Sequence, residues 1–146
     1  MKDKKTILFV CTGNSCRSQM AEGFMNFYLS TQTTQYRVLS AGLKPSDVNN
    51  NAIKVMKEKN IDISRQTSNH LEDYINISHE YVITLCDNAK ESCPTGLVSK
   101  KNIHWSIPDP YVEEETINTD LSKYRLSRDM INSRIEKLVK IICEEE

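Results

Sequence analysis

Short hydrophobic runs alternate along the chain with segments whose apolar residues recur at helical spacing. The runs TILFVC (6–11), YRVLSAG (36–42), EYVITLC (80–86) and NIHWSI (102–107) have the length and composition of β-strands. The first and third runs are almost entirely apolar, which is typical of strands that are covered on both faces of a sheet. The pattern therefore predicts four strands.

Helical periodicity is clearest after the first strand and near the end of the chain. In the segment 18–28, one face carries Met20, Ala21, Phe24 and either Phe27 or Tyr28. A long amphipathic helix is predicted from about residue 119 to residue 143. Its apolar stripe consists of Leu121, Tyr124, Ile131, Ile135, Leu138 and Ile142.

Two shorter helices are predicted from residues that can cap a helix N-terminus. Asp47 or Asn49 can cap a helix that extends into the fifties. Thr67 or Ser68 can cap a short helix, with Glu72 as the partner in a capping box.

The alternation of strands and helices predicts an α/β fold: a single three-layer domain over residues 1–146. A central four-stranded parallel sheet is expected, with helices on both faces. In such sheets, ligands bind beyond the carboxyl ends of the strands. Cys11 and Cys86 stand at two of these ends, and Asp109 closely follows a third. We therefore expect three reactive groups to meet at one edge of the sheet.

Composition limits the partners of this chain. Its 146 residues, 38% of them hydrophobic and 27% charged, are typical of one soluble globular domain. A net charge of −1 gives no bulk electrostatic reason to bind nucleic acid or an anionic membrane. No apolar run is long enough to cross a bilayer, and the one near the N-terminus is too short for a signal peptide. We expect a cytoplasmic protein that acts as a monomer.

The chain has five cysteines, an odd number that does not suit a disulfide framework in a reducing compartment. The spacings Cys-x4-Cys and Cys-x6-Cys, without a nearby histidine, do not favour structural zinc. Reactive thiols, or buried thiols that pack as small hydrophobic groups, remain. The five are Cys11, Cys16, Cys86, Cys93 and Cys143.

The stretch CTGNSCRS (11–18) joins the first predicted strand to the first predicted helix. A tight loop in this position turns successive N–H groups inward and forms an anion-binding cradle at a helix N-terminus. Gly13 and Asn14 tolerate the unusual backbone angles that such a loop needs. Arg17 adds a planar fork of donors for a tetrahedral oxyanion, and Ser18 can donate to the sulfur of Cys11. The expected oxyanion-binding residues are Thr12, Gly13, Asn14, Ser15, Cys16 and Arg17.

This environment favours the thiolate form of Cys11 and presents it as a nucleophile to the centre of a bound oxyanion. The alternative interpretation is a buried structural cysteine beside a surface arginine. Cys-x5-Arg alone would leave that alternative open. The position after a strand and before a helix, with glycine and asparagine inside, favours the nucleophile.

Five segments spread over nearly the whole chain also carry a family resemblance. They are CTGNSCRSQMAE (11–22), SAG (40–42), IDIS (61–64), VITLCDNAKESCP (82–94) and HW…DP (104–110). Together they resemble the thioredoxin-coupled arsenate reductases of the low-molecular-weight tyrosine phosphatase superfamily. The form of the loop and the pair Cys86 and Cys93 resemble the reductases more, because phosphatases of this fold have no obvious need for the pair.

The resemblance implies a reaction with three thiols and no required cofactor. Cys11 would form an adduct with arsenic, Cys86 would displace arsenite from it, and Cys93 would move the disulfide to Cys86–Cys93. Thioredoxin would be the external reductant. Cys16 is not needed by this relay and is expected to be a bystander. Asp109 is the expected general acid, although Pro108 stands where reductases commonly carry another aspartate.

Some reductases of this type hold a potassium ion near the phosphate loop. By position, Asn14, Glu22 and Ser40 match that site. Asn69 stands where an aspartate would be expected, so the resemblance implies at most a weak potassium site.

Three functions remain open at this point. The first is arsenate reduction coupled to thioredoxin. The second is a low-molecular-weight tyrosine phosphatase that hydrolyses phosphate monoesters through Cys11; the shared loop and the sequence DPY (109–111) favour it. The third is a non-enzymatic module that senses oxyanions or redox state, for which no partner surface is evident in the sequence.

Overall fold

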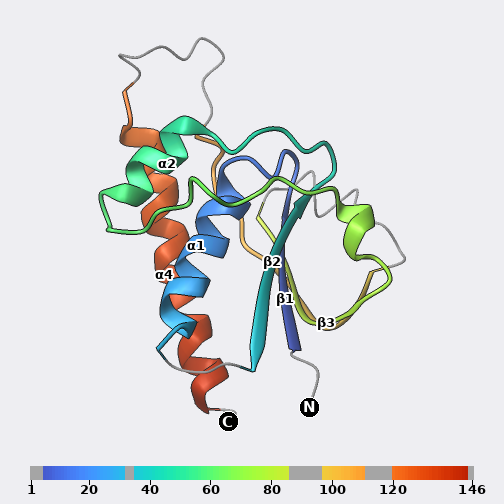
Figure 1. Ribbon diagram of the computed structural model, residues 1–146. Helices are drawn as coiled ribbons and strands as arrows, with labels where there is room; N and C mark the ends of the chain where they lie inside the picture. Colours follow the sequence, from blue (N-terminus) through green and yellow to red (C-terminus); the bar gives the residue numbers. More distant parts are fainter. Residues whose placement is uncertain (1–4, 32–34, 86–96, 111–119, 145–146) are drawn as a thin grey trace.

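The computed structural model describes residues 5–31, 35–85, 97–110 and 120–144 (Figure 1). Its four strands are β1 (Lys5–Cys11), β2 (Tyr36–Gly42), β3 (Ser78–Thr84) and β4 (Val98–His104). All neighbouring strands are parallel, in the order β2-β1-β3-β4. The central strand β1 is buried along Thr6–Cys11, as its continuous apolar run predicts. The predicted four-stranded parallel sheet is confirmed.

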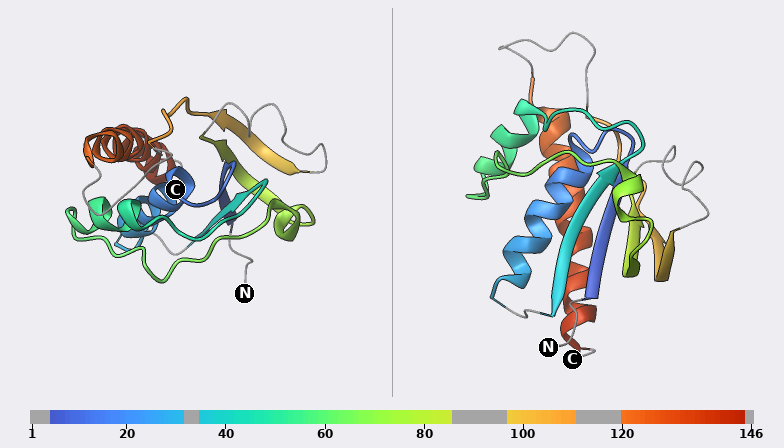
Figure 2. Two further views of the ribbon diagram at one scale, coloured as in Figure 1. Left: turned by 90° about the horizontal axis from the view of Figure 1, so that it is seen from above. Right: turned by 45° about the vertical axis from the view of Figure 1, so that its right-hand side comes forward.

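The helices are α1 (Arg17–Leu29), α2 (Asn50–Lys57) and α4 (Ser122–Glu144), and a short 3₁₀ helix, η1, spans Leu71–Tyr74. The three α-helices lie together on one face of the sheet, and η1 lies on the other (Figure 2). The α1 helix contacts β1 and β2, and its residues Met20, Ala21 and Phe24 are buried, whereas Phe27 is exposed. The α4 stripe is buried as predicted, except that Leu121 precedes the helix and is only partly buried.

The structure confirms one predicted helix cap, corrects another and moves two predicted strands. The third strand spans Ser78–Thr84 rather than 80–86. Asn49 is confirmed as the cap of α2, because its Oδ1 accepts from Asn51 N and Ala52 N. The predicted cap of the short helix is wrong, since His70 caps η1 through its Nδ1. The fourth strand also differs from the prediction, since β4 begins at Val98 and ends at His104 rather than spanning 102–107. The hydrophobic pattern did not predict its first half, because lysines rather than apolar residues occupy it.

The two outer strands of the sheet are exposed to different extents. The carboxyl end of β2 is covered by the segment before η1, where Gly42 N donates to Asn69 O at 2.9 Å. Among the described residues, β4 pairs only with β3, and most of its side chains are exposed. Lys100 Nζ lies 3.5 Å from Glu80 Oε2, and Lys101 Nζ lies 5.2 Å from the centre of the Tyr81 ring.

The carboxyl ends of the strands and the N-termini of α1 and α4 lie at the same end of the molecule (Figure 1). This end therefore gathers the residues that follow β1, β2 and β4. Within the described residues, no helix is both long enough and apolar enough to cross a membrane.

Candidate active site

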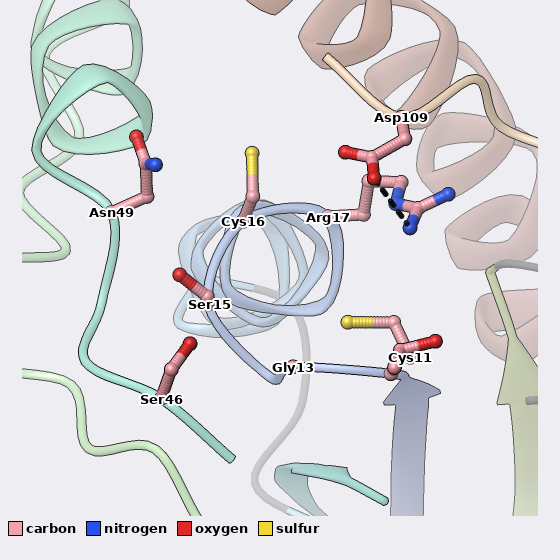
Figure 3. Close-up of a pocket in the computed structure, with 9 residues that line it drawn as sticks. Cys11, Gly13, Ser15, Cys16, Arg17, Ser46, Asn49 and Asp109 are labelled. Atoms are coloured by element: carbon pink, nitrogen blue, oxygen red, sulfur yellow. Dashed lines mark ion pairs between the residues drawn. The ribbon is translucent and has the colours of Figure 1, made fainter. Parts of the chain in front are cut away.

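The loop between β1 and α1 curls around a pocket at the carboxyl end of the sheet (Figure 3). Three of its carbonyl oxygens are held from outside by backbone N–H groups of the segment 44–49. Because the C=O and N–H of a trans peptide point in opposite directions, the N–H groups that follow these carbonyls point into the loop. The loop is thereby a cradle of donors, as the sequence predicts. The bonds are Lys44 N to Thr12 O at 2.8 Å, Ser46 N to Gly13 O at 2.9 Å and Asn49 N to Ser15 O at 2.9 Å.

The curvature of the loop depends on Asn14 and Gly42. Asn14 has a φ of 44°, in the left-handed region that asparagine tolerates better than most residues. The same prediction for Gly13 is wrong, because no described glycine has a positive φ. Gly42 is the constrained glycine: a Cβ there would lie 2.7 Å from both Asn14 N and Thr12 O. The end of β2 can approach the loop only without a side chain at Gly42.

Cys11 lies at the floor of the pocket and is 3% exposed. Its Sγ is 3.0 Å from Ser18 Oγ, and this hydroxyl is 2.8 Å from Asn14 Oδ1. One hydroxyl proton can serve only one of these two acceptors. Ser18 can therefore donate to Asn14 while Cys11 is a thiol, and can donate to the sulfur when Cys11 is a thiolate. The expected contact between Ser18 and Cys11 is confirmed.

A fully buried glutamine that sequence reasoning missed supports the loop from below. Gln19 Nε2 lies 2.9 Å from Asn14 O, 3.1 Å from Asn14 Oδ1 and 3.0 Å from Thr67 O. Gln66 Nε2 in turn donates to Gln19 Oε1 at 2.8 Å. Gln19 thus fixes both the backbone and the side chain of Asn14. The signal in the sequence was a long polar side chain directly before Met20, on the buried side of the first helical turn.

Arg17 and Asp109 lie next to each other on one side of the pocket (Figure 3). Arg17 Nη1 donates to Ile107 O at 3.0 Å, and Nη2 lies 3.7 Å from Asp109 Oδ2. The Arg17 side chain is 12% exposed, whereas that of Asp109 is 57% exposed. Arg17 is therefore fixed beside the cradle, and Asp109 is open to a ligand and to water. The structure brings Cys11, Arg17 and Asp109 to one pocket, as predicted.

The pocket has a volume of about 340 Å³. Ser46 and Asn49, which the sequence analysis did not assign to the site, form the wall opposite Asp109 (Figure 3). None of the described lining residues is aromatic; Trp105 packs near Phe9 with ring centres 6.1 Å apart, and Tyr111 lies outside the described residues. The lining residues are Cys11, Thr12, Gly13, Ser15, Cys16, Arg17, Ser46, Asn49 and Asp109.

Cys16 belongs to the cradle through its backbone rather than its thiol. Its Sγ points away from the Cys11 sulfur, toward the space between Asn49 and Asp109 (Figure 3). Among the described residues, no side chain caps α1, which begins at Arg17. The first N–H groups of this helix are therefore available to an anion. The other thiol outside the relay, Cys143, is partly buried on α4 and packs against the core.

The four residues of the predicted potassium site lie together, but their oxygens are already engaged. Ser40 Oγ donates to Glu22 Oε1 at 2.5 Å. The Nδ2 atoms of Asn14 and Asn69 point toward Ser40 O, at 3.3 and 3.4 Å. Burial raises the pKa of Glu22 above its ordinary value, and the weaker, opposing effect comes from the Ser40 hydrogen bond. A cation would have to displace amide donors here, so the residues do not fit a resident potassium ion.

Cys86 and Cys93 lie outside the described residues. The residue before Cys86 is described: Leu85 N donates to Val10 O at 2.9 Å, and Leu85 O accepts from Ile107 N at 3.4 Å. Leu85 therefore lies between the residue that precedes Cys11 and the segment that carries Asp109. In the part of the chain that the structure describes, no group of three or more histidine, cysteine or acidic side chains could hold a metal ion.

A cysteine at the floor of a backbone cradle, with an arginine beside it and an aspartate opposite, defines a thiol-centred oxyanion site on a parallel α/β sheet. The sequence model of the low molecular weight phosphotyrosine protein phosphatases matches residues 6–146. The chain belongs to this family.

Several relatives of this chain are named for a different reaction. "Arsenate reductase 1" of Bacillus cereus is 44% identical over 137 residues, covering 94% of this chain and 96% of that protein. The "Arsenate reductase" of Halalkalibacterium halodurans is 43% identical over 134 residues, covering 92% and 94%.

Solved structures of both kinds of protein have this fold. "An arsenate reductase in the phosphate binding state" is 35% identical, with a TM-score of 0.78 over 94% of this chain and 98% of that one. A low molecular weight protein tyrosine phosphatase from T. tengcongensis is 25% identical, with a TM-score of 0.77 over 94% of this chain and 99% of that one.

Proposed function

We propose that this protein reduces arsenate to arsenite and that Cys11 is the nucleophile. The observation that carries the proposal is the position of the Cys11 sulfur at the floor of the cradle, 3.0 Å from Ser18 Oγ. The cradle suits a tetrahedral oxyanion, and arsenate is one. The relatives named arsenate reductase, at 43–44% identity over nearly the whole chain, support the choice of substrate.

In the first step, the Cys11 thiolate attacks arsenic, and one arsenate oxygen departs as water. Asp109 supplies a proton to that oxygen, which its position across the pocket from Cys11 allows. Arg17 and the inward N–H groups hold the remaining oxygens and stabilise their negative charge. The product is a Cys11–arsenic(V) thioester-like adduct in which a sulfur–arsenic bond has replaced an oxygen–arsenic bond.

Two further thiols complete the reduction. The Cys86 thiolate attacks the Cys11 sulfur, the sulfur–arsenic bond breaks, and its electron pair leaves with arsenic as arsenite. Cys93 then attacks Cys86, which frees Cys11 as a thiolate and leaves a Cys86–Cys93 disulfide. A dithiol reductant of the thioredoxin type returns this disulfide to two thiols. The hydrogen bond from Leu85 N to Val10 O supports the relay, because it brings the chain that leads into Cys86 beside the strand that ends at Cys11.

A tyrosine phosphatase activity is the second candidate, because the family and the cradle are compatible with it. In that reaction Cys11 would take a phosphoryl group and water would release it, so one thiol would suffice. The described walls favour the reductase, since Ser46, Asn49 and Ser15 offer no flat apolar surface to an aromatic ring.

We further propose that the protein is a cytoplasmic monomer that needs no resident metal ion. Its oligomeric state can be measured by size-exclusion chromatography with light scattering.

The test compares two reactions in the same four proteins: wild type, Cys11→Ser, Cys86→Ser and Cys93→Ser. Arsenate-dependent oxidation of NADPH is followed with thioredoxin and thioredoxin reductase, and hydrolysis of p-nitrophenyl phosphate is followed separately. Cys11→Ser should lose both reactions. Cys86→Ser and Cys93→Ser should lose arsenate turnover but keep hydrolysis of the ester, because water completes that reaction.

Peptide mass spectrometry adds a second readout. After arsenate treatment, Cys93→Ser should accumulate a Cys11–Cys86 disulfide, since its first two thiols are intact. Cys143→Ser is the matched control, because Cys143 lies on α4 outside the site, and it should behave like wild type. Thioredoxin-linked turnover near wild type in both relay variants would refute the relay through Cys86 and Cys93. A wild-type protein that hydrolyses the ester but does not turn over arsenate would refute the reductase and leave the phosphatase.

A further inference from the structure

The segment that carries Asp109 has few backbone donors with which to hold its position. Asp109 stands between Pro108 and Pro110, and neither proline has an N–H group. Beside the bond from Ile107 N to Leu85 O, the segment is also attached through its carbonyl oxygens. Two of them are bound by side chains: Arg17 Nη1 donates to Ile107 O at 3.0 Å, and Ser127 Oγ donates to Pro108 O at 2.8 Å.

Ser127 is well placed to act as an anchor. It is 1% exposed and lies in the second turn of α4, at the end of that helix that is next to the site. The residue after it, Arg128, fixes this turn to α2: its Nη1 donates to Val55 O at 2.9 Å and to Glu58 Oε1 at 2.7 Å. The Ser127 hydroxyl thus belongs to a helical turn that is fixed to α2. The cap of α2, Asn49, lies in the opposite wall of the pocket.

The space behind Asp109 makes this anchor important. A second cavity of about 290 Å³ lies between the 108–110 segment and α4, and Lys123, Leu126 and Ser127 form its α4 side. Pro108 and Asp109 are exposed beside this pocket, so close packing does not hold this part of the segment in place, whereas Ile107 and Pro110 on either side are buried. Ile107 and Asp109 each precede a proline, which confines both to extended backbone angles. A shift of the Pro108 carbonyl is therefore transmitted to Asp109.

We propose that Ser127 is a positioning residue for this reaction: its hydrogen bond to the Pro108 carbonyl holds Asp109 where it can protonate the leaving oxygen. The inference rests on the proposed role of Asp109. Ser127 touches neither substrate nor the Cys11 sulfur, so its loss should reduce proton transfer and leave binding of the oxyanion intact. General acid catalysis contributes about 100- to 10,000-fold, and a misplaced acid retains part of that. We expect Ser127→Ala to slow the first turnover about 10-fold.

The experiment measures the rate of the first turnover by rapid quench and arsenite determination, together with the dissociation constant of arsenate. The variants are Ser127→Ala, Ser127→Thr, Asp109→Asn and the double variant Ser127→Ala/Asp109→Asn. Ser133→Ala is the matched control, because Ser133 is an exposed serine on the same helix. Ser127→Ala should lower the rate without weakening arsenate binding. Ser127→Thr should restore the rate, since it keeps the hydroxyl at a position that lines a pocket.

The double variant separates positioning from general damage to the fold. If Ser127 acts through Asp109, Ser127→Ala should cost nothing further once Asp109 is already asparagine. The alkaline limb of the pH–rate profile should flatten in both Ser127→Ala and Asp109→Asn. If the rate losses of the two single variants add up in the double variant, the inference is overturned. The same holds if Ser127→Ala is unimpaired while Asp109→Asn is impaired; in both cases the proposed function stands. If Asp109→Asn has the wild-type rate, Asp109 is not the general acid, and the inference about Ser127 fails as well.

Discussion

Replacing Gly42 with alanine tests how closely β2 supports the cradle. The added Cβ would lie 2.7 Å from Asn14 N and from Thr12 O, and 3.0 Å from Gly13 C. All three neighbours are backbone atoms, so no flexible side chain can move aside. Ordinary van der Waals contact begins near 3.4 Å, so the loop and β2 must separate by about 0.7 Å.

This separation has a cost in stability and a larger cost in rate. Overpacking of this kind typically lowers the free energy of unfolding by about 1–3 kcal/mol. The N–H groups of the cradle would shift by a similar fraction of an ångström from the positions that the oxyanion needs. A misplacement of about 1 Å can reduce a rate about 100-fold, so we expect Gly42→Ala to lose between 10- and 100-fold in turnover.

Gly13→Ala is the comparison for stability. A Cβ on Gly13 would meet Ser46 Oγ at 3.5 Å and Ser15 Cβ at 3.6 Å, which are ordinary contact distances. Its free energy of unfolding, measured by urea titration, should therefore stay within about 1 kcal/mol of wild type. Arsenate turnover and inorganic phosphate affinity are then measured for Gly42→Ala. If Gly42→Ala retains wild-type stability and turnover, the close approach of β2 does not shape the cradle.

Three other predictions concern separate parts of the molecule. Arg17→Lys should reduce arsenate turnover at least about 100-fold, because an ammonium group cannot replace the planar fork; a variant near wild type would mean that backbone N–H groups suffice. Hydrogen bonds from Arg125 and, to a smaller extent, from Arg128 lower the pKa of Glu58 to about 2. The contribution of this carboxylate to stability is therefore present above pH 4.5 and is lost as the pH falls toward 2. Because this carboxylate is 38% exposed, Glu58→Gln should cost only about 1 kcal/mol at pH 7 and less at pH 3, as urea titrations at the two pH values can measure. The melting temperature of Asn69→Asp should be higher in potassium chloride than in equimolar choline chloride, whereas that of wild type should be the same in both salts. Equal responses of the two proteins would contradict the conclusion that the oxygens around Ser40 are already engaged in wild type.

The strands and the cradle could be predicted because local sequence determines them. A continuous apolar run ending at Cys11 fits only a covered strand, and the polar loop before Arg17 has few other conformations between a strand and a helix. The meeting of Cys11 with Asp109 followed from the rule that parallel strands share one carboxyl edge. These inferences needed no knowledge of side-chain packing.

The supporting residues could not be predicted because their roles depend on contacts between distant segments. Gly42 looked like a strand terminator, and only the approach of Thr12 and Asn14 makes its missing side chain necessary. Ser127 was one polar residue in an amphipathic helix until Pro108 was placed against it. The cap of η1 was wrong for a related reason, since His70 Nδ1 performs a role that sequence patterns usually assign to serine or threonine.

The outer edge of β4, which has no strand partner among the described residues, bears on whether two molecules can pair edge to edge. An open strand edge can recruit the edge of a second molecule and start aggregation. Lys100 and Lys101, adjacent in β4, place a positive charge on each face of that edge, because neighbouring side chains in a strand alternate. Two molecules that approached edge to edge through β4 would bring four ammonium groups together, and their repulsion, offset in part by the Glu80 carboxylates, would oppose such pairing.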